Sequence, residues 1–239
     1  MTTGTPLEGK VAIITGASRG IGLAVAHRLG KMGAKLALCA RDPQRLEGAA
    51  SELRTDAAGV FTAAFDIRQS DQIVAFVQNT EKMLGPVEIL VNNAGIGYFG
   101  PTHEASEANW DSVLDTNLKS VFLASKAVAA GMIQRRSGHI INIASLAGKN
   151  AFAGGGIYCA SKWGLLGLTE CMAEDLRQYG IRVSAICPGS VATEFSPHGK
   201  KDVSKMLQAD DIAHAVAMIV TQAPQSFISE VLMRPTQKP

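Results

Sequence analysis

Tyr158 and Lys162 stand four residues apart in an apolar stretch, and Ser145 precedes the tyrosine by thirteen residues. A spacing of four places two side chains on the same face of a helix, so the lysine ammonium can lie close to the phenol oxygen. A nearby cation favours phenolate and is expected to lower the tyrosine pKa from its ordinary value of about 10, toward the range of efficient proton transfer. The pair predicts acid–base chemistry, although a tyrosine and a lysine can also share a helix face for packing alone.

A glycine-rich segment near the start of the chain predicts an anion-binding turn. The stretch VAIITGASRGIGLAVAHRL begins with β-branched residues typical of a buried strand and ends with the apolar spacing of a helix. Between them lie Gly16, Gly20 and Gly22, in a G-x-x-x-G-x-G spacing that differs from the more common G-x-G-x-x-G. Glycines allow a sharp turn and the close approach of phosphate oxygens to N–H groups at a helix start. We therefore expect this turn to bind a pyrophosphate.

The rest of the sequence alternates between strand and helix patterns, without internal repeats or long linkers. Strands are expected near 10–15, 35–40, 60–65, 87–92, 138–144, 181–187 and 227–232. Helices are expected near 20–32, 43–55, 70–83, 106–136 with a break near Asn117, and 157–179. This alternation predicts an α/β fold: a single domain over residues 1–239, with a Rossmann-type, doubly wound parallel sheet of about seven strands and helices on both faces.

Residues with chemical potential follow three of the expected strands. Asn93 follows EILVN, Ser145 follows HIINIA, and Pro188 with Gly189 follows VSAIC. Open parallel sheets bind ligands at the carboxyl ends of their strands. Residues far apart in the sequence are therefore expected to converge on one crevice.

The charge at the end of the second strand bears on cofactor choice. NAD-binding sheets usually carry an acid there, which accepts a hydrogen bond from the ribose 2′-OH. Here Ala40 takes that position, Arg41 follows it, and Arg19 lies in the glycine turn. Two guanidinium groups could clamp a 2′-phosphate, which predicts NADP(H) as the cofactor, although both could instead be solvated surface residues. Asp42, followed by Pro43, is expected to cap the next helix rather than bind ribose.

Several motifs occur in the order found in one enzyme family: TGASRGIG at 15–22, Asp66 after the third strand, NNAG at 92–95, Asn117, Ser145, Tyr158 with Lys162, and PGSVAT at 188–193. On these residues the chain resembles the short-chain dehydrogenase/reductases, nearest to the NADP-dependent branch with 3-oxoacyl-carrier-protein reductases and related carbonyl reductases. It departs from them in lacking a T-G…D-G-G ending. After Thr193 it has only a short polar segment, interpreted as a substrate lid near 194–210.

The resemblance implies a role for each catalytic residue. Tyr158 exchanges a proton with the substrate oxygen, and Ser145 donates a hydrogen bond to that oxygen. Lys162 binds the nicotinamide ribose and lowers the tyrosine pKa, while Asn117 holds a water that links the lysine to solvent.

The resemblance also implies a cofactor site, in which Asp66 bonds the adenine amino group and Asn93 lines the adenosine ribose. Val191 and Thr193 lie near the carboxamide and phosphates. The full predicted cofactor-binding set is Gly16, Ser18, Arg19, Gly20, Ile21, Gly22, Arg41, Asp66, Ile67, Asn93, Ala94, Gly95, Tyr158, Lys162, Pro188, Gly189, Val191 and Thr193. The expected walls of the substrate pocket are Tyr98, Phe99, Phe152, Ile157, Phe195 and His198, the histidine more as a lid or surface residue than as a catalyst.

Composition limits the classes of partner. The chain has 239 residues with 46% apolar content and a net charge of +2, and no basic run exceeds two residues, so nucleic acid is not expected as a partner. The beginning, MTTGTPLEGK, has no apolar leader, and no run is long enough to span a membrane, so a cytoplasmic location is expected. Four scattered cysteines without C-x-x-C argue against a metal site and a disulfide framework.

The predicted function is an NADP(H)-dependent oxidoreductase that transfers a hydride between the nicotinamide and a carbonyl or secondary alcohol of a small or medium organic substrate. One alternative substrate is a 3-oxoacyl thioester on an acyl carrier protein, for which Arg135-Arg136 is the candidate docking patch. An alternative from another class is a non-catalytic, dinucleotide-sensing binding protein. A homo-oligomer, with a tetramer favoured, is expected through the helices near 117–136 and 157–179, on the basis of Val121, Phe122, Trp163, Leu166 and Met172.

Overall fold

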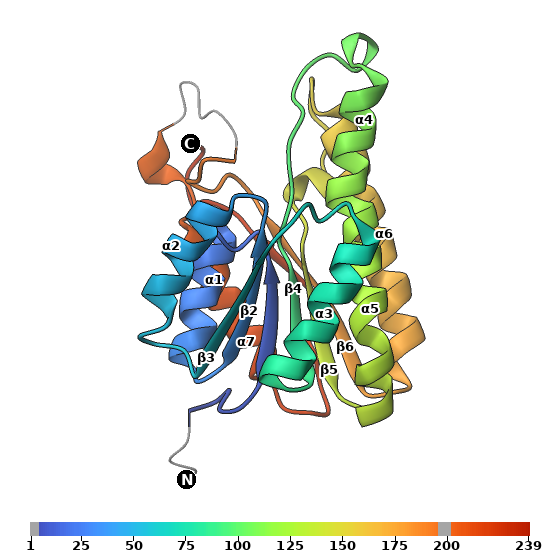
Figure 1. Cartoon of the computed structure of the whole chain (residues 1–239). Coiled ribbons are helices and arrows are strands. Elements are labelled where there is room, and N and C mark those ends of the chain that lie inside the picture. The colour runs from blue at the N-terminus through green and yellow to red at the C-terminus, as the bar shows by residue number, and fades with distance from the viewer. Residues whose placement is uncertain (1–4, 196–201) are drawn as a thin grey trace.

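The computed structural model describes residues 5–195 and 202–239, and its central element is one parallel sheet (Figure 1). The strands lie in the order β3-β2-β1-β4-β5-β6-β7, and every neighbouring pair runs parallel. The chain therefore reverses its direction of sheet growth between β1 and β4, the place where open α/β sheets form their ligand crevice. The bounds are β1 (Val11–Thr15), β2 (Lys35–Ala40), β3 (Gly59–Ala64), β4 (Val87–Asn92), β5 (Gly138–Ile143), β6 (Ile181–Pro188) and β7 (Glu230–Met233).

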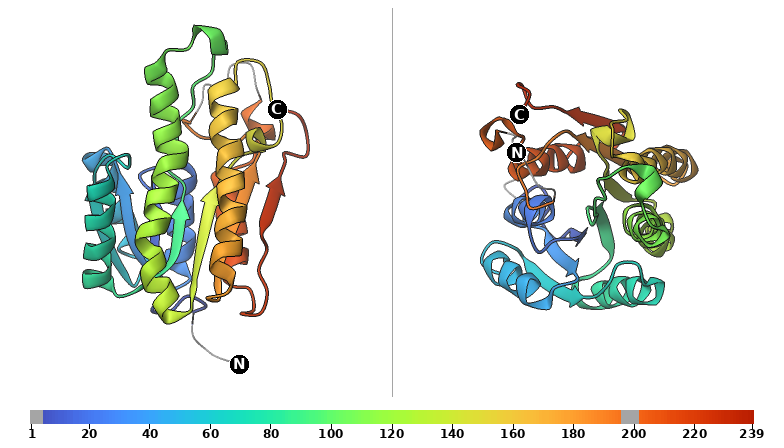
Figure 2. Two further views of the ribbon diagram at one scale, coloured as in Figure 1. Left: turned by 90° about the vertical axis from the view of Figure 1, so that its right-hand side faces the viewer. Right: turned by 90° about the horizontal axis from the view of Figure 1, so that it is seen from above.

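Helices cover both faces of the sheet, as the views in Figures 1 and 2 show. One layer contains α1, α2 and α7, and the other contains α3, α5 and α6, with α4 leading into α5. The bounds are α1 (Gly20–Lys31), α2 (Pro43–Leu53), α3 (Ser70–Leu84), α4 (Glu107–Leu114), α5 (Ser120–Arg135), α6 (Gly156–Arg177) and α7 (Ala209–Val220). The doubly wound α/β fold expected from the sequence is confirmed.

Burial on both faces explains why the strands are continuous apolar runs. All five residues of β1 are buried, because helices pack against the sheet from both sides. On α1, the buried Val25, Ala26 and Leu29 recur at helical spacing and face the core, whereas Lys31 stays in solvent. The strands that carry the site are thus held rigidly from two directions.

Two parts of the expected element list were wrong. Helix α7 was not expected, because the polar segment before it was interpreted as a lid that extends to residue 210. The buried face of α7, with Ile212, Val216 and Ile219, packs against α1. Strand β7 begins at Glu230 rather than near 227. Part of the predicted lid range is anchored, since Met206 is buried and Leu207 forms a β-bridge with Val191. The segment 196–201 of that range lies outside the described residues.

The long helix expected over 106–136 is interrupted where a break near Asn117 was predicted. Residues Asp115–Lys119 form a π-helical turn between α4 and α5, in which Ser120 N donates to Asp115 O. Such turns insert one extra residue into a helix and commonly mark functional positions. Within the part of the chain that the structure describes, no helix is both long and apolar enough to cross a bilayer.

Candidate active site

A cleft of about 1580 Å³ opens at the carboxyl ends of the strands, around the switch between β1 and β4. Of the predicted cofactor-binding residues, all except Gly22 line it, and so do Ser145, Tyr158 and Lys162. Asn117 lies behind the wall rather than in it. The convergence expected from the strand ends is present, and the cleft is large enough for a dinucleotide together with a small substrate.

The glycine turn is tightly packed against the residues that follow β4. Gly16 adopts φ +66°, and a Cβ at Gly22 would lie 2.4 Å from the Gly16 carbonyl oxygen. Asn93 Nδ2 donates to the carbonyl oxygens of Thr15 (2.9 Å) and Gly16 (3.1 Å), and Thr15 Oγ1 accepts from the backbone N–H groups of Asn93 and Ala94 at 3.0 Å each. Gly22 is therefore required for backbone packing inside the turn, and Asn93 holds the turn in place besides lining the cleft.

The start of α1 is suited to bind an anion. Arg19 at its N-cap makes no side-chain cap, and its first turn contains no acid. By contrast, the side chain of Asp42 caps α2 by accepting from Gln44 N and Arg45 N at 3.0 Å each, which confirms its expected role as a cap. The free N–H groups of α1, next to glycines that admit close approach, fit the pyrophosphate of a dinucleotide.

Three arginines line the cleft beyond the ends of β1 and β2, where two were predicted. Arg19 donates to Glu194, and Arg45 Nη1 donates to the same carboxylate oxygen at 3.2 Å. Arg41 is exposed and lies near enough to Asp66 to help lower the pKa of that carboxyl. The sequence reasoning missed Arg45 and Glu194, although Arg45 lies in the first turn of the helix that Asp42 and Pro43 were expected to begin.

Asp66 follows β3 and lines the cleft as expected, but its carboxylate is paired with Arg68. Arg68 Nη2 lies 2.5 Å from Asp66 Oδ2, and Arg68 N donates to Oδ1 at 3.0 Å. These bonds, first of all those from the guanidinium, hold the pKa of Asp66 below its ordinary value. Any contact of Asp66 with an adenine would share the carboxylate with Arg68.

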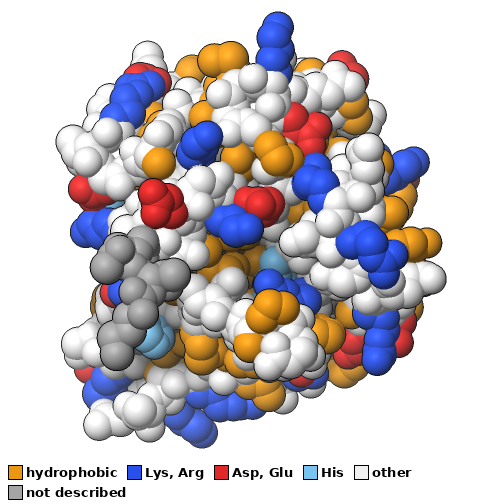
Figure 3. Space-filling model, turned by 90° about the horizontal axis from the view of Figure 1, so that it is seen from below, with side chains coloured by type: hydrophobic (Ala, Val, Ile, Leu, Met, Phe, Trp, Pro, Cys, Tyr) orange, Lys and Arg blue, Asp and Glu red, His pale blue; other side chains and the backbone are white. Residues whose placement is uncertain are grey.

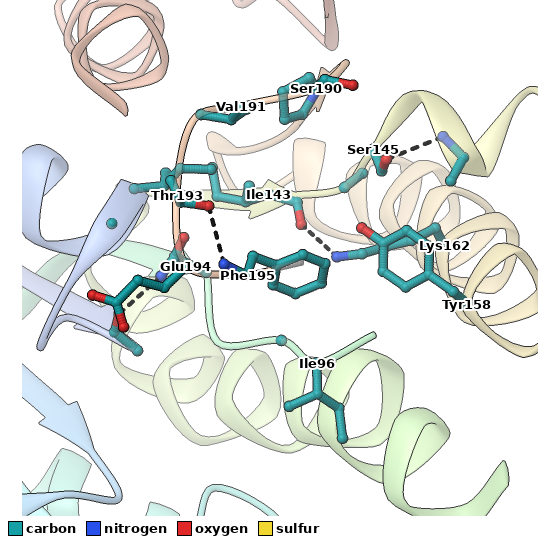
Figure 4. Close-up of a pocket in the computed structure, with 18 of the residues that line it drawn as sticks. Ile96, Ile143, Ser145, Tyr158, Lys162, Ser190, Val191, Thr193, Glu194 and Phe195 are labelled. Atoms are coloured by element: carbon teal, nitrogen blue, oxygen red, sulfur yellow. Dashed lines mark hydrogen bonds between the residues drawn. The ribbon is translucent and has the colours of Figure 1, made fainter. Parts of the chain in front are cut away.

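Tyr158 and Lys162 lie together on α6 and point into the cleft (Figure 4). Lys162 Nζ donates to the carbonyl oxygen of Ile143 at 2.8 Å and stands 5.9 Å from the centre of the Tyr158 ring. Burial raises the pKa of Tyr158 to about 12, although hydrogen bonding to Ser145 lowers it. Burial lowers the pKa of Lys162 to about 8. The lowered tyrosine pKa that the spacing predicted is not found, because desolvation of the phenolate is the largest effect on the pKa of Tyr158.

Ser145 lies at the end of β5, where the strand passes into a short 3₁₀ turn. Its Oγ accepts from Ala147 N at 3.1 Å, which leaves its hydroxyl proton available. Ser145 lies near enough to the Tyr158 side chain to help lower the pKa of the phenol, and both residues line the same cleft. The three residues thus supply two hydroxyl donors and an ammonium to the same region.

Asn117, in the π-helical turn, ties the strand ends to α6. Its Oδ1 accepts from Ile96 N at 2.8 Å, and its Nδ2 donates to Ile96 O at 2.8 Å and to Ser161 Oγ at 3.0 Å. Both side-chain N–H groups are therefore committed within the protein. The side chain fixes the loop after β4 against α6, the helix that carries Tyr158.

An aromatic collar of Phe99, Phe152 and Phe195 surrounds the phenol of Tyr158. The ring centres of Phe99 and Phe195 lie 5.5 and 5.7 Å from that of Tyr158, and Phe152 packs against Phe99. The three side chains of the collar are 42–49% exposed. Of the other expected wall residues, Ile157 is buried in the core, Tyr98 does not line the cleft, and His198 lies outside the described residues.

Two further features near the site had no clear signal in the sequence. A buried polar chain links the strands: Asn92 Nδ2 donates to Asn142 Oδ1 at 2.9 Å, and Asn142 Nδ2 donates to Thr169 Oγ1 at 2.9 Å. It connects β4 and β5 with α6 just below the residues of the cleft. The segment from Arg234 to Pro239 also lines the cleft, because β7 directs it toward the carboxyl edge of the sheet.

A parallel sheet with a glycine turn at its switch point, and a Ser–Tyr–Lys set beside it, defines a dinucleotide-dependent oxidoreductase. The family model for short chain dehydrogenases matches residues 10–204. The chain belongs to the short-chain dehydrogenase family, whose members act on carbonyl and alcohol groups, and it is an enzyme of that kind.

Individual relatives are similar over most of their length. The chain is 42% identical over 212 residues, which cover 88% of it and 78% of the relative, to the "Granaticin polyketide synthase putative ketoacyl reductase 1" of Streptomyces violaceoruber. It is 38% identical over 190 residues (80% of this chain, 74% of the relative) to gluconate 5-dehydrogenase of Gluconobacter oxydans. A solved metagenomic short-chain oxidoreductase in complex with NADP is 46% identical, with a TM-score of 0.87 and coverage of 98% and 100%.

Proposed function

We propose that this protein uses NADP(H) to reduce a carbonyl group, and that Tyr158, Ser145 and Lys162 carry the reaction. The observation that supports the cofactor most directly is the set of three arginines, Arg19, Arg41 and Arg45, which line the cleft at the end of β2 where an NAD enzyme usually has an acid. A solved relative with 46% identity holds NADP. When bound, the reduced nicotinamide supplies the hydride for the carbonyl carbon.

The remaining chemistry falls to the protein's own side chains. With its pKa raised to about 12, Tyr158 is protonated at neutral pH and can donate its proton to the carbonyl oxygen. Ser145 donates a second hydrogen bond to that oxygen. Lys162, charged below about pH 8, stabilises the phenolate that remains after the proton has left and binds ribose hydroxyls. Oxidation of an alcohol would require the phenolate first, and burial of the phenol opposes its formation.

The aromatic collar suggests the character of the substrate. Phe99 and Phe195 pack against the Tyr158 ring and Phe152 packs against Phe99, so the phenol is bordered by partly exposed apolar surface. Apolar or aromatic groups next to the carbonyl would bury area there and stack favourably, at roughly 0.5–1.5 kcal/mol for each aromatic contact. A small or medium ketone with an apolar flank fits this opening better than a strongly charged substrate.

An acyl-carrier-protein substrate is favoured only by the ketoacyl reductase relatives. Its candidate docking patch lies at the wrong end of the molecule. Arg135 Nη2 donates to Val87 O at the first residue of β4, and Arg136 Nη2 donates to Gln178 O just before β6. Both side chains therefore lie at the amino ends of the strands, opposite the cleft. Figure 3 shows that face, where basic side chains are scattered among acidic and neutral ones.

We also propose that the protein forms homo-oligomers through α5 and α6, with a tetramer favoured. Of the five residues on which this expectation depended, Val121 and Leu166 are buried within the chain and Met172 packs into the core. Phe122 and Trp163, however, are 46% and 54% exposed on these adjacent helices. Sedimentation should give an oligomer that Trp163→Glu dissociates, and a wild-type monomer at micromolar concentration would contradict it. A cytoplasmic location stays a prediction of the sequence.

Steady-state assays of NADPH absorbance test the proposed function. The panel should contain an aryl methyl ketone, an alkyl methyl ketone of equal carbon number, a sugar and a soluble 3-oxoacyl thioester. We expect the highest kcat/KM with the aryl ketone, and a preference for NADPH over NADH. A preference for the thioester would favour the acyl-carrier-protein alternative. Tight NADPH binding without turnover of any substrate would favour the dinucleotide sensor.

A further inference from the structure

Glu194 places a carboxylate among the arginines at the phosphate end of the cleft. Its Oε2 accepts from Nη1 of Arg19, in the glycine turn, and from Nη1 of Arg45, in the first turn of α2, at 3.2 Å. The three residues come from distant parts of the sequence, and all of them line the cleft. Figure 4 shows Glu194 pointing away from Tyr158, whereas the next residue, Phe195, points toward the tyrosine.

The pairing uses the chemistry by which these arginines would bind a phosphate. A carboxylate and a phosphate both accept charge-assisted, planar hydrogen bonds from guanidinium groups. Hydrogen bonds from Arg45 and Arg19 hold the pKa of Glu194 below its ordinary value, so the group is an anion at neutral pH. A phosphate that accepts from the same Nη1 groups would have to displace Glu194, and one that accepts from the other N–H groups of Arg19 and Arg45 would lie beside a like charge.

We propose that Glu194 is a specificity-determining residue, whose carboxylate competes with the 2′-phosphate of the dinucleotide for Arg19 and Arg45. This proposal rests on the proposed use of NADP(H). Glu194 lowers the affinity for 2′-phosphorylated ligands and leaves the affinity for unphosphorylated ones unchanged. It thereby narrows the preference for NADP(H) over NAD(H) that the arginines create.

The size of the effect follows from exposure. The side chains of Glu194, Arg19 and Arg45 are 64%, 51% and 55% exposed. Ion pairs between side chains this exposed are individually weak, because solvent screens the charges. Removal of the carboxylate from two such pairs should therefore tighten the binding of a 2′-phosphate about two- to tenfold.

Equilibrium binding of cofactor fragments measures the competition between Glu194 and the 2′-phosphate independently of catalysis. Titration calorimetry should compare 2′,5′-ADP, which carries the 2′-phosphate, with 5′-ADP, which lacks it. Glu194→Gln should lower the Kd of 2′,5′-ADP two- to tenfold and change that of 5′-ADP less than twofold. The matched control is Glu174→Gln, which removes one negative charge from an exposed ion pair with Arg177 on α6 (2.9 Å) and should change neither Kd. In an Arg45→Ala background the gain from Glu194→Gln should shrink.

Arg19→Ala separates failure of this inference from failure of the cofactor assignment. If Arg19→Ala weakens 2′,5′-ADP but Glu194→Gln leaves it unchanged, the competition is wrong and the NADP(H) assignment stands. If Glu194→Gln weakens 5′-ADP, the carboxylate is a ribose acceptor and the proposal is overturned. If wild type does not discriminate the two fragments and Arg19→Ala has no effect, both the assignment and the competition fail.

Discussion

The two ends of the cleft work in different electrostatic surroundings. At the end that holds the proposed catalytic residues, Tyr158, Lys162 and Asn117 are only 9%, 5% and 1% exposed, and burial dominates the pKa values of the first two. At the phosphate end, Arg19 and Arg45 are half exposed and share one carboxylate. When a buried group is removed, water cannot take over its hydrogen bonds. When one exposed arginine is removed, a neighbouring arginine can still bind the same anion. Single substitutions should therefore have large effects at the first end and modest effects at the second.

The largest effect is expected for Tyr158, the proposed proton donor at the buried end of the cleft. Tyr158→Phe should lower turnover at least 10²-fold, the usual scale for a general acid, while the Kd for NADPH changes little. Tyr179→Phe, outside the cleft, is the matched control and should keep wild-type turnover. Near-normal turnover of Tyr158→Phe would show that the tyrosine is not the proton donor. It would also contradict the expectation that substitutions have larger effects at the buried end than at the exposed end.

The burial of Lys162 should make the free energy of unfolding depend on pH. Its pKa is lower in the folded protein, about 8, than the ordinary value of 10.5, so the unfolded chain binds more protons between these values. Stability should therefore rise with pH across that window, because the penalty of the buried ammonium is relieved. Relative to Lys162→Met, the wild type should gain roughly 2 to 3 kcal/mol in free energy of unfolding between pH 7 and pH 10.

Denaturant unfolding at both pH values checks this expectation. Lys82→Met, at an exposed position of α3, should show no such change relative to wild type. A pH-independent difference between wild type and Lys162→Met would mean that the lysine is not desolvated in the folded protein.

Gly22→Ala tests the backbone packing between the two ends. The added Cβ would lie 2.4 Å from the Gly16 carbonyl oxygen, and relief of this clash would require a costly shift of the backbone. We expect a loss of about 1–3 kcal/mol in stability and weaker binding of NADPH and NADH alike. Gly167→Ala is the control, since a Cβ there meets nothing within 4 Å and a helical glycine replaced by alanine is stabilising. A selective loss of NADPH would indicate that the turn contacts the 2′-phosphate.

The smallest of these effects is expected at the exposed end. Arg41→Ala should raise the Kd for NADPH about tenfold and leave that for NADH within twofold, since a charge-assisted bond contributes roughly 1.5 kcal/mol or more and Arg19 and Arg45 compensate in part. Arg177→Ala, on the distant part of α6, controls for net charge. An equal loss of both cofactors would contradict a role for Arg41 in selecting NADP(H).

The sequence was informative wherever a pattern is local. The β-branched run of β1, the glycines of the turn and the Asp42-Pro43 cap each predicted the structure found there, because strand burial, sharp turns and capping depend on neighbouring residues. The break near Asn117 was predicted too. Helix α7 was missed, since its apolar spacing follows a polar segment that drew attention to a lid.

What the sequence alone determined was the order of strands and helices, and with it the edge of the sheet where Asn93, Ser145 and Pro188 meet. What only the tertiary structure decided was the environment of each group. The Tyr158–Lys162 spacing predicted a lowered tyrosine pKa, whereas burial raises it, because desolvation depends on every element packed around the phenol. The contact of Glu194 with Arg19 and Arg45 joins residues up to 175 positions apart, and no local pattern encodes such a pair.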